Sequence, residues 1–239
     1  MGITIHYRLS TQKEWTDENV REWLEIVADY ARHLGCAHVG SVVSAYKLAE
    51  VTAKLHKVGR KGFWRFVPIN PTDGWAVEIE IGKGCEPLVL ALCKYPARWR
   101  TDRGRLKIWH PTKISREWQF GWFCKTQFAG QHGAAHFLRC HKTVISLLDF
   151  CRKAGLEVMV KDEAGYWEQR DEAGLAKTLR RSEALLAAFG GLMKDMADTP
   201  GGPAVESPIF DYANFEHLEQ EGWEQFGIHF EKLRSFATP

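Results

Sequence analysis

Three side chains able to bind a metal ion recur at four-residue intervals in the segment HGAAHFLRC, and they are His132, His136 and Cys140. Positions four apart lie on neighbouring turns of one helix face, where imidazole and thiolate groups can converge on zinc or a similar ion. The segment lacks the HExxH pattern of metalloproteases, because Gly133 stands where the glutamate would be. Cys140 also continues into an apolar stripe, and the positive end of the helix dipole disfavours a cation. We therefore predict that no metal is bound, that Cys140 faces the core, and that a neutral His136 is hydrogen-bonded near the helix start.

Carboxylates form a second candidate group in the segment DEAGYWEQRD, which contains Asp162, Glu163 and Glu168 around Tyr166 and Trp167. Carboxylates beside a glycine turn can divide acid and base roles between them, or can bind Mg²⁺. The alternative is a solvated turn at a strand end, with the two aromatic rings covering the edge of the sheet. These residue types leave the cofactor unknown.

The elements that would position both groups are a strand, a helix and a second strand between Trp122 and Trp167. WFCKTQF interleaves apolar and polar residues, a helical period follows, and Gly155 ends the helix before the second strand. Such a crossover is right-handed, and strands that it joins within one sheet run parallel, so their carboxyl ends meet at one edge. The polar residues expected to meet there are Lys125, Gln127, His132, His136, Asp162 and Glu163.

The chain opens with the same order of elements. Ile3–Tyr7 alternates like a strand, Thr16 can cap a helix that ends at Gly35, and a second strand is expected over 36–43. An offset of 120 residues aligns the two halves, pairing Ile3 with Phe123, Tyr30 with Phe150 and Gly35 with Gly155. We predict an α+β fold with a mixed sheet, built from two pseudo-equivalent strand-helix-strand halves with added antiparallel strands.

After the first strand-helix-strand unit, the spacing of apolar residues predicts a helix over 46–57 and a turn at GRKG, residues 59–62. Strands are expected over 63–69, 75–81 and 88–93, the last two forming a hairpin with Glu86 near its tip.

Residues 98–118 form the least regular segment, and it interleaves seven Arg and Lys residues with Trp99, Trp109 and Trp118. Cationic side chains can neutralise phosphates while tryptophans stack on bases, so this composition suits single-stranded nucleic acid. The alternative is that the tryptophans belong to the core.

The C-terminal part is predicted to contain a helix over 175–196, a Pro- and Gly-rich linker over 198–208, and an acidic amphipathic helix that docks on the rest. Residues 1–198 then form one body, with pseudo-repeats 1–118 and 119–198, and residues 199–239 form the linker and docking segment.

Composition limits the classes of function. The net charge of +2 argues against a nucleic-acid protein by itself, and no segment is long and apolar enough to span a bilayer. Six cysteines without CxxC pairs indicate reduced, buried thiols. We expect a cytoplasmic protein without a membrane partner.

The segments WFCKTQFA, HFLRCH, LLDFCRKAG and DEAGYWEQRD resemble an uncharacterised family of bacterial proteins in which a CKTQ-like strand precedes a helix and a DEGGYWE-like turn follows it. GCEP at 84–87 is similar to a further motif of that family, whereas Ala164 replaces the first glycine of the family's turn. The resemblance implies no activity, but it marks residues, which are Glu86, Lys125, Gln127, His136, Asp162, Glu163, Tyr166, Trp167 and Glu168.

The functional expectation is a pocket for a small molecule or peptide-like ligand at the strand-end edge, with its enzymatic role left open. Lys125 and Gln127 would position the ligand, and Asp162 or Glu163 would act as base or ligand group. The alternatives are an interaction protein without catalysis and a binder of single-stranded nucleic acid through 98–118.

Overall fold

A computed structural model describes residues 3–12, 14–58, 64–103, 106–114, 116–197 and 205–237. Its main sheet is built from β1 (Thr4–Thr11), β2 (His38–Val39), β3 (Val43–Ser44), β6 (Asp73–Glu80), β7 (Leu88–Lys94), β10 (Gln119–Lys125) and β11 (Leu156–Asp162). The order is β11-β1-β10-β7-β6-β2, with β3 also paired to β6, and neighbouring strands are antiparallel. Helices and this sheet together confirm the predicted α+β class.

The N-terminal strand β1 lies between the two strands of the central crossover. Both β10 and β11 pair antiparallel with β1, so they run parallel to each other, as predicted, without being neighbours. The helix α2 (Ala134–Lys153) connects them, which makes a split strand-helix-strand unit. The carboxyl ends of β10 and β11 therefore meet at the edge where β1 begins.

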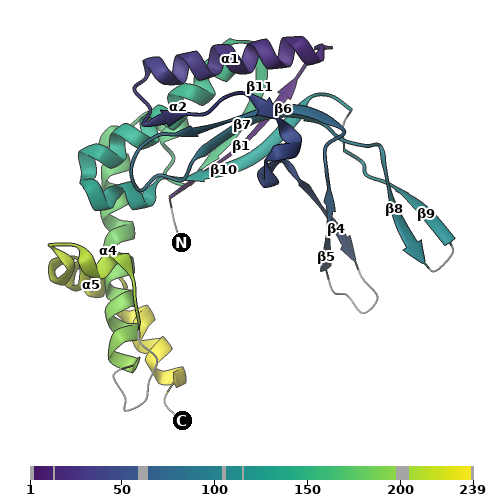
Figure 1. The fold of residues 1–239 in the computed structure, drawn as a ribbon. Helices are drawn as coiled ribbons and strands as arrows, with labels where there is room; N and C mark the ends of the chain where they lie inside the picture. The colour runs from purple at the N-terminus through teal and green to yellow at the C-terminus, as the bar shows by residue number, and fades with distance from the viewer. Residues whose placement is uncertain are drawn as a thin grey trace.

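Two helices cover one face of the sheet, α2 and α1 (Asp17–His33), and they lie side by side in Figure 1. Thr16 caps α1, because its side chain accepts the Asn19 N–H while the Asn19 side chain accepts the Thr16 N–H. The chain leaves α1 through Gly35, whose φ of 73° is a left-handed conformation suited to glycine. Both predicted ends of this helix are confirmed.

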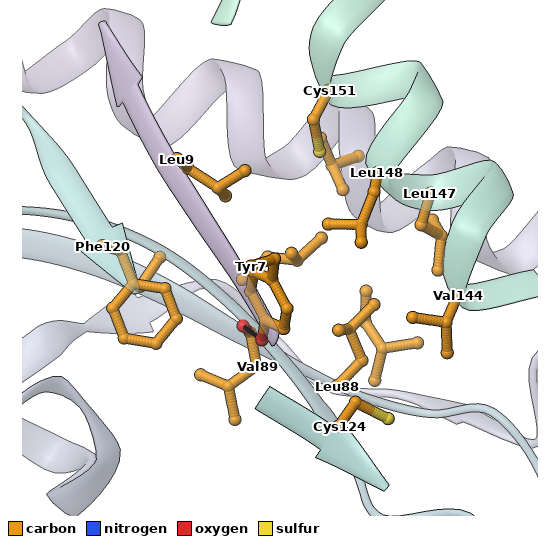
Figure 2. Packing of buried hydrophobic residues seen from close by; sticks show 14 of the residues in the cluster. Tyr7, Leu9, Leu88, Val89, Phe120, Cys124, Val144, Leu147, Leu148 and Cys151 are labelled. Carbon is orange, nitrogen blue, oxygen red and sulfur yellow. Dashed lines mark hydrogen bonds between the residues drawn. The ribbon is translucent and has the colours of Figure 1, made fainter. Parts of the chain in front are cut away.

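The core fills the space between the sheet and α2, as Figure 2 shows for Leu9, Leu88, Phe120 and Leu148. These side chains come from three strands and one helix, and all are buried. Tyr7 is buried with them, and its hydroxyl donates a hydrogen bond to the Val89 carbonyl. The phenol therefore keeps a polar partner inside an apolar region, and burial raises its pKa.

Three local predictions are wrong. The segment expected to be a helix over 46–57 instead forms two short 3₁₀ turns (Ala45–Lys47 and Ala49–Val51) and the strand β4 (Ala53–Val58). The turns pack on β6 and β7, and β4 pairs with β5 (Trp64–Ile69), so tertiary pairing overrides a short helical pattern. The irregular segment after residue 98 is a regular hairpin of β8 (Arg98–Arg103) and β9 (Leu106–Pro111). The strand expected over 36–43 is reduced to β2 and β3, each two residues long.

Both hairpins, β4–β5 and β8–β9, project from the sheet on the side away from α1 (Figure 1). The predicted GRKG turn lies outside the described residues.

At the other end of the sheet, α4 (Glu172–Ala197) extends away from the body and α5 (Phe215–Ala237) packs along it (Figure 1). The short helix α3 (Tyr166–Gln169) and the 3₁₀ helices Gln127–His132 and Pro208–Asp211 complete the fold. The helix α5 is continuous through its glycines. Gly222 allows α5 to pack closely on α4, because a Cβ there would lie 2.1 Å from the Ala184 carbonyl oxygen. Residues 198–204 of the predicted linker lie outside the described residues.

The contact between α1 and α2 and the positions of the strands that follow them bear on the predicted duplication. Tyr30 on α1 and Phe150 on α2, which the 120-residue offset aligns, stack with ring centroids 4.3 Å apart. Their return strands differ, however, since β11 adjoins β1 whereas β2 lies at the far edge of the sheet. The duplication stays a prediction.

Candidate functional site

The strand-end edge brings together most of the residues singled out in the sequence. Thr4 pairs with Lys125, and Ile5 pairs with Asp162, so the ends of β10 and β11 flank the start of β1. Glu163 follows directly after β11. The expected convergence of Lys125, Gln127, Asp162 and Glu163 on one edge is therefore a feature of the structure.

The side chains of Gln127, Glu163 and Glu86 bond to the backbone at this edge. The Gln127 side-chain oxygen Oε1 accepts the Ile3 N–H at 2.8 Å, and the Glu163 carboxylate accepts the Thr4 N–H at 3.1 Å. On the other side of β10, Glu86 accepts the Lys125 N–H at 3.2 Å. Each group satisfies a main-chain donor beyond the regular ladder, so each helps to position the strand ends.

A row of partly exposed side chains, which we call the strand-end strip, runs across the sheet face opposite α1 and α2. Its members are Glu86, Lys125, Phe123, His6 and Glu163. Lys125 Nζ lies 3.6 Å from Glu86 Oε1 and 5.5 Å from the centre of the Phe123 ring. His6 Nε2 lies 3.6 Å from Glu163 Oε1. The strip presents carboxylate, amine, ring, imidazole and carboxylate in that order, and neither His6 nor Phe123 was predicted from the sequence to belong to it.

Behind the strip lies a buried network of Thr126, His141 and Asp162. The His141 ring nitrogens lie 2.9 Å from Thr126 Oγ1 and 3.1 Å from Asp162 Oδ2. The Asp162 carboxylate also accepts the N–H groups of Ala164 and Trp167. Burial alone would raise the pKa of Asp162, but the hydrogen bonds and charge of His141, with the two N–H groups, outweigh it and lower that pKa. This network joins the ends of β10 and β11 to α2.

The sequence did not single out Thr126 or His141 for this network. One signal was available: His141 lies four residues after Phe137 and three before Val144, on the apolar face of the helix. A histidine on such a face needs buried polar partners.

The residues after Asp162 cover the edge of the sheet with aromatic rings, which is the alternative to a group of functional carboxylates. Tyr166 is buried and its ring lies edge-on to His141 at 6.0 Å. Trp167 is half-buried under the guanidinium groups of Arg152 and Arg170, at 4.9 and 4.8 Å from its ring. Glu168 is exposed on α3.

The predicted set of His132, His136 and Cys140 is only partly assembled. His132 ends a 3₁₀ helix before α2 begins, and its ring lies 5.4 Å from that of His136. His136 Nε2 is 2.9 Å from the Lys83 carbonyl oxygen and 3.5 Å from Cys140 Sγ. Cys140 is buried, as predicted, and burial raises its pKa to about 11. Across the part of the chain that is described, no group of three or more His, Cys, Asp or Glu residues is arranged to hold a metal ion.

A cavity of about 460 Å³ adjoins the strand-end strip at Glu163, and we call it the edge cavity. It is lined by Ile3, Glu163, Thr178, Arg181, Ser182, Leu185 and Phe226. Arg181, on α4, lies with its guanidinium 5.4 Å from the centre of the Phe226 ring. Nothing in the sequence distinguished Arg181 from the other charges of its helix.

Two further cavities of about 480 and 560 Å³ lie near Trp122 and Trp118. Among the described residues that line these three cavities, only Glu163 belongs to the predicted site. Lys125, Gln127 and Asp162 lie at the same edge without lining the edge cavity, although Gln127 and Glu163 hold the backbone of Ile3 and Thr4 beside it. His136 lies against the Lys83 carbonyl and does not line the cavity either.

The three tryptophans of 98–118 differ in environment. Trp118 is buried and donates to the Trp15 carbonyl, and Trp99 stacks on His110 at 4.6 Å. Trp109 is 57% exposed on the β8–β9 hairpin. The core alternative thus holds for Trp118, and Trp109 is a ring that a ligand can reach.

Comparisons of the chain with protein-family models, curated proteins and solved structures find no significant match. Within the described residues, every helix is too short or too polar to cross a membrane.

Proposed function

We propose that the chain binds a small zwitterionic ligand, of the size of an amino acid or short peptide, in the edge cavity. The observation that carries this proposal is the presence of a carboxylate and a guanidinium, from Glu163 and Arg181, in one cavity with the apolar walls Ile3, Leu185 and Phe226. Glu163 would take the ligand's ammonium group and Arg181 its carboxylate, while the apolar part of the ligand packs on the walls.

Two features support a preformed site at this position. The Glu163 carboxylate is held by the Thr4 N–H and by His6, so binding loses little side-chain entropy there. The volume of about 460 Å³ falls within the range of small-molecule pockets, roughly 300–1,000 Å³. Glu163 is also the carboxylate of the cavity that would act as a general base, and His6 Nε2 lies 3.6 Å from its Oε1.

Lys125 and Gln127 keep the positioning role expected from the sequence, but they position parts of the protein near the cavity and do not contact the ligand. Gln127 fixes Ile3, which is a wall of the cavity, and Lys125 pairs with Glu86 across the strip. Membership of the bacterial family that the motifs resemble stays a prediction, and the six free cysteines support the cytoplasmic location that we propose.

A panel of amino acids and dipeptides tested by calorimetry and thermal shift against the full chain checks the proposal. We expect at least one zwitterion to bind and to raise the unfolding temperature, because a ligand that binds only the folded state stabilises it. Arg181→Ala should weaken binding of that zwitterion more than binding of its amide, which lacks the carboxylate.

Lys177→Ala is the matched control, because Lys177 is exposed on the same helix and does not line the edge cavity. The proposal fails if no zwitterion binds at millimolar concentration, or if Lys177→Ala and Arg181→Ala weaken binding equally.

A second candidate function is binding of single-stranded nucleic acid by the β8–β9 hairpin, and the exposed ring of Trp109 favours it. Arg98, Lys107 and Lys113 are exposed on or beside the same hairpin and could contact phosphates. An oligonucleotide should then bind more weakly as salt rises, and Trp109→Ala should reduce the affinity. Absence of retention at low salt removes this candidate.

A further inference from the structure

Two cysteine thiols meet next to the strand-end strip. Cys85 Sγ lies 3.8 Å from Cys124 Sγ, although the two residues are 39 positions apart in the chain. Cys85 belongs to the loop between β6 and β7, and Cys124 is the penultimate residue of β10. A disulfide requires its sulfurs at about 2.0 Å, so the two thiols must approach further before they can bond.

The two thiols differ in how far a reagent can reach them. Cys85 is half-buried, whereas Cys124 is fully buried and its thiol lies 3.2 Å from the Glu86 carbonyl oxygen. The contact with Cys85, and then burial, raise the pKa of Cys124 well above its usual value. Cys85 is therefore the thiol that meets a solute first, and Cys124 is the protected one behind it.

The surroundings hold the pair together. The Cys85 N–H donates to the Gly82 carbonyl, and the Glu86 N–H donates to the Lys125 carbonyl, so the residues on both sides of the contact are anchored. Gly84 brings the loop against the start of the 3₁₀ helix after β10, where a Cβ on it would lie 2.3 Å from the Phe128 carbonyl oxygen. The loop is thus packed close to the end of β10.

We propose that Cys85 and Cys124 form a reversible redox pair whose oxidant is a hydroperoxide. The Cys85 thiolate attacks the terminal peroxide oxygen, which forms an S–O bond, breaks the O–O bond and releases the alcohol or, from hydrogen peroxide, water. Cys124 then attacks the sulfenic sulfur of Cys85, which forms the S–S bond and releases water. Two thiols lose two electrons in total, the peroxide gains them, and an external dithiol reverses the reaction by exchange.

The bond would link the β6–β7 loop covalently to β10 directly beside Glu86 and Lys125, which follow the two cysteines in the chain. This inference does not depend on the ligand of the edge cavity.

The test exposes the full, reduced chain to hydrogen peroxide and maps the products by peptide mass spectrometry without reduction. We expect one Cys85–Cys124 cross-link, loss of two free thiols per chain, and recovery of both thiols with dithiothreitol. Cross-linking of Cys85 to Cys36 or Cys140 instead, or a Cys85 that stays reduced or is oxidised without a cross-link, would overturn the proposal.

Three variants separate the steps. Cys85→Ser should abolish the cross-link, and Cys124→Ala should let sulfenic acid accumulate at Cys85, where a 1,3-dione reagent traps it. Cys36→Ser is the matched control, because Cys36 is also half-buried and lies near enough to Cys85 to affect its own pKa, yet the cross-link should persist. Loss of the cross-link in Cys36→Ser would contradict the assignment. The wild-type map decides the pairing even if Cys124→Ala folds poorly.

Discussion

The imidazole of His141 and the carboxylate of Asp162 lie 3.1 Å apart, and neither side chain is exposed to solvent. This contact joins the middle of the apolar face of α2 to the last residue of β11, and through Thr126 it reaches the end of β10. The edge that carries the candidate site is therefore held by a polar contact inside the core as well as by the strand ladder.

Replacing His141 by Ala should lower the free energy of unfolding by about 3–5 kcal/mol, because it leaves the Asp162 carboxylate buried without the imidazole that bonds to it. Urea unfolding followed by tryptophan fluorescence measures the change. Lys142→Ala is the control one residue further along α2, where an exposed pair with Glu172 is worth less than about 1 kcal/mol. Equal effects of the two variants would contradict the role assigned to the buried pair.

The same pair predicts a dependence of stability on pH. The pKa of Asp162 is lower in the folded chain than the unfolded value of about 3.9, so its contribution is present above that value and is lost as the pH falls through the folded pKa. Wild type should therefore lose stability more steeply than Asp162→Asn below about pH 5. Denaturant titrations between neutral and acidic pH give the stability of both proteins as a function of pH. Parallel curves would show that Asp162 does not cause the loss of stability at low pH.

Gly84 and Gly35 allow a test of the packed loop. Both have a φ of 73°, but a Cβ on Gly84 would lie 2.3 Å from a backbone oxygen, whereas one on Gly35 would meet nothing within 4 Å. Gly35→Ala should cost about 1–2 kcal/mol, which is the left-handed strain alone. Gly84→Ala should cost clearly more, because the loop must also move away from Phe128. Thermal unfolding compares the two, and a similar loss in both would refute the close approach.

Removing the N-terminal cap of α1 is expected to reduce stability by a smaller amount. Thr16→Ala removes the acceptor for the Asn19 N–H and should reduce stability by about 1 kcal/mol. Thr16→Ser, which keeps the hydroxyl, should restore most of the loss. A change in the unfolding midpoint that is the same for both variants would mean that the methyl group of Thr16, rather than its hydroxyl, is responsible.

Whether a contact could be predicted from the sequence depends on how far apart its residues lie in the chain. The meeting of Lys125 and Asp162 at one edge was predictable, because crossover geometry depends on a short stretch of chain. That β1 would lie between β10 and β11 was not, since no local pattern specifies which distant strand enters a gap. The strip residue His6 and the cavity residue Arg181 were missed for the same reason, as their neighbours come from other parts of the chain.

The errors at 46–57 and 98–118 have a different cause. Over 46–57 a short helical period competes with strand pairing to β5, and over 98–118 β8 and β9 pair with each other in a segment predicted to be irregular. Thr52 and Val51 were read as helical, yet the chain there bends to cover β6 and β7 and then enters a hairpin. Propensity over so few residues contributes less than the backbone hydrogen bonds that the hairpin forms.

The position of β1 also constrains how the protein emerges from the ribosome. Thr4 to Ser10 is made long before its partners on the two sides, which are Gln119 to Lys125 and Glu157 to Asp162. One edge of β1 therefore stays unpaired until residue 125 has been translated, and the other until residue 162. During that interval its unpaired edges are exposed to wrong partners, and slow translation before residue 162 prolongs the exposure.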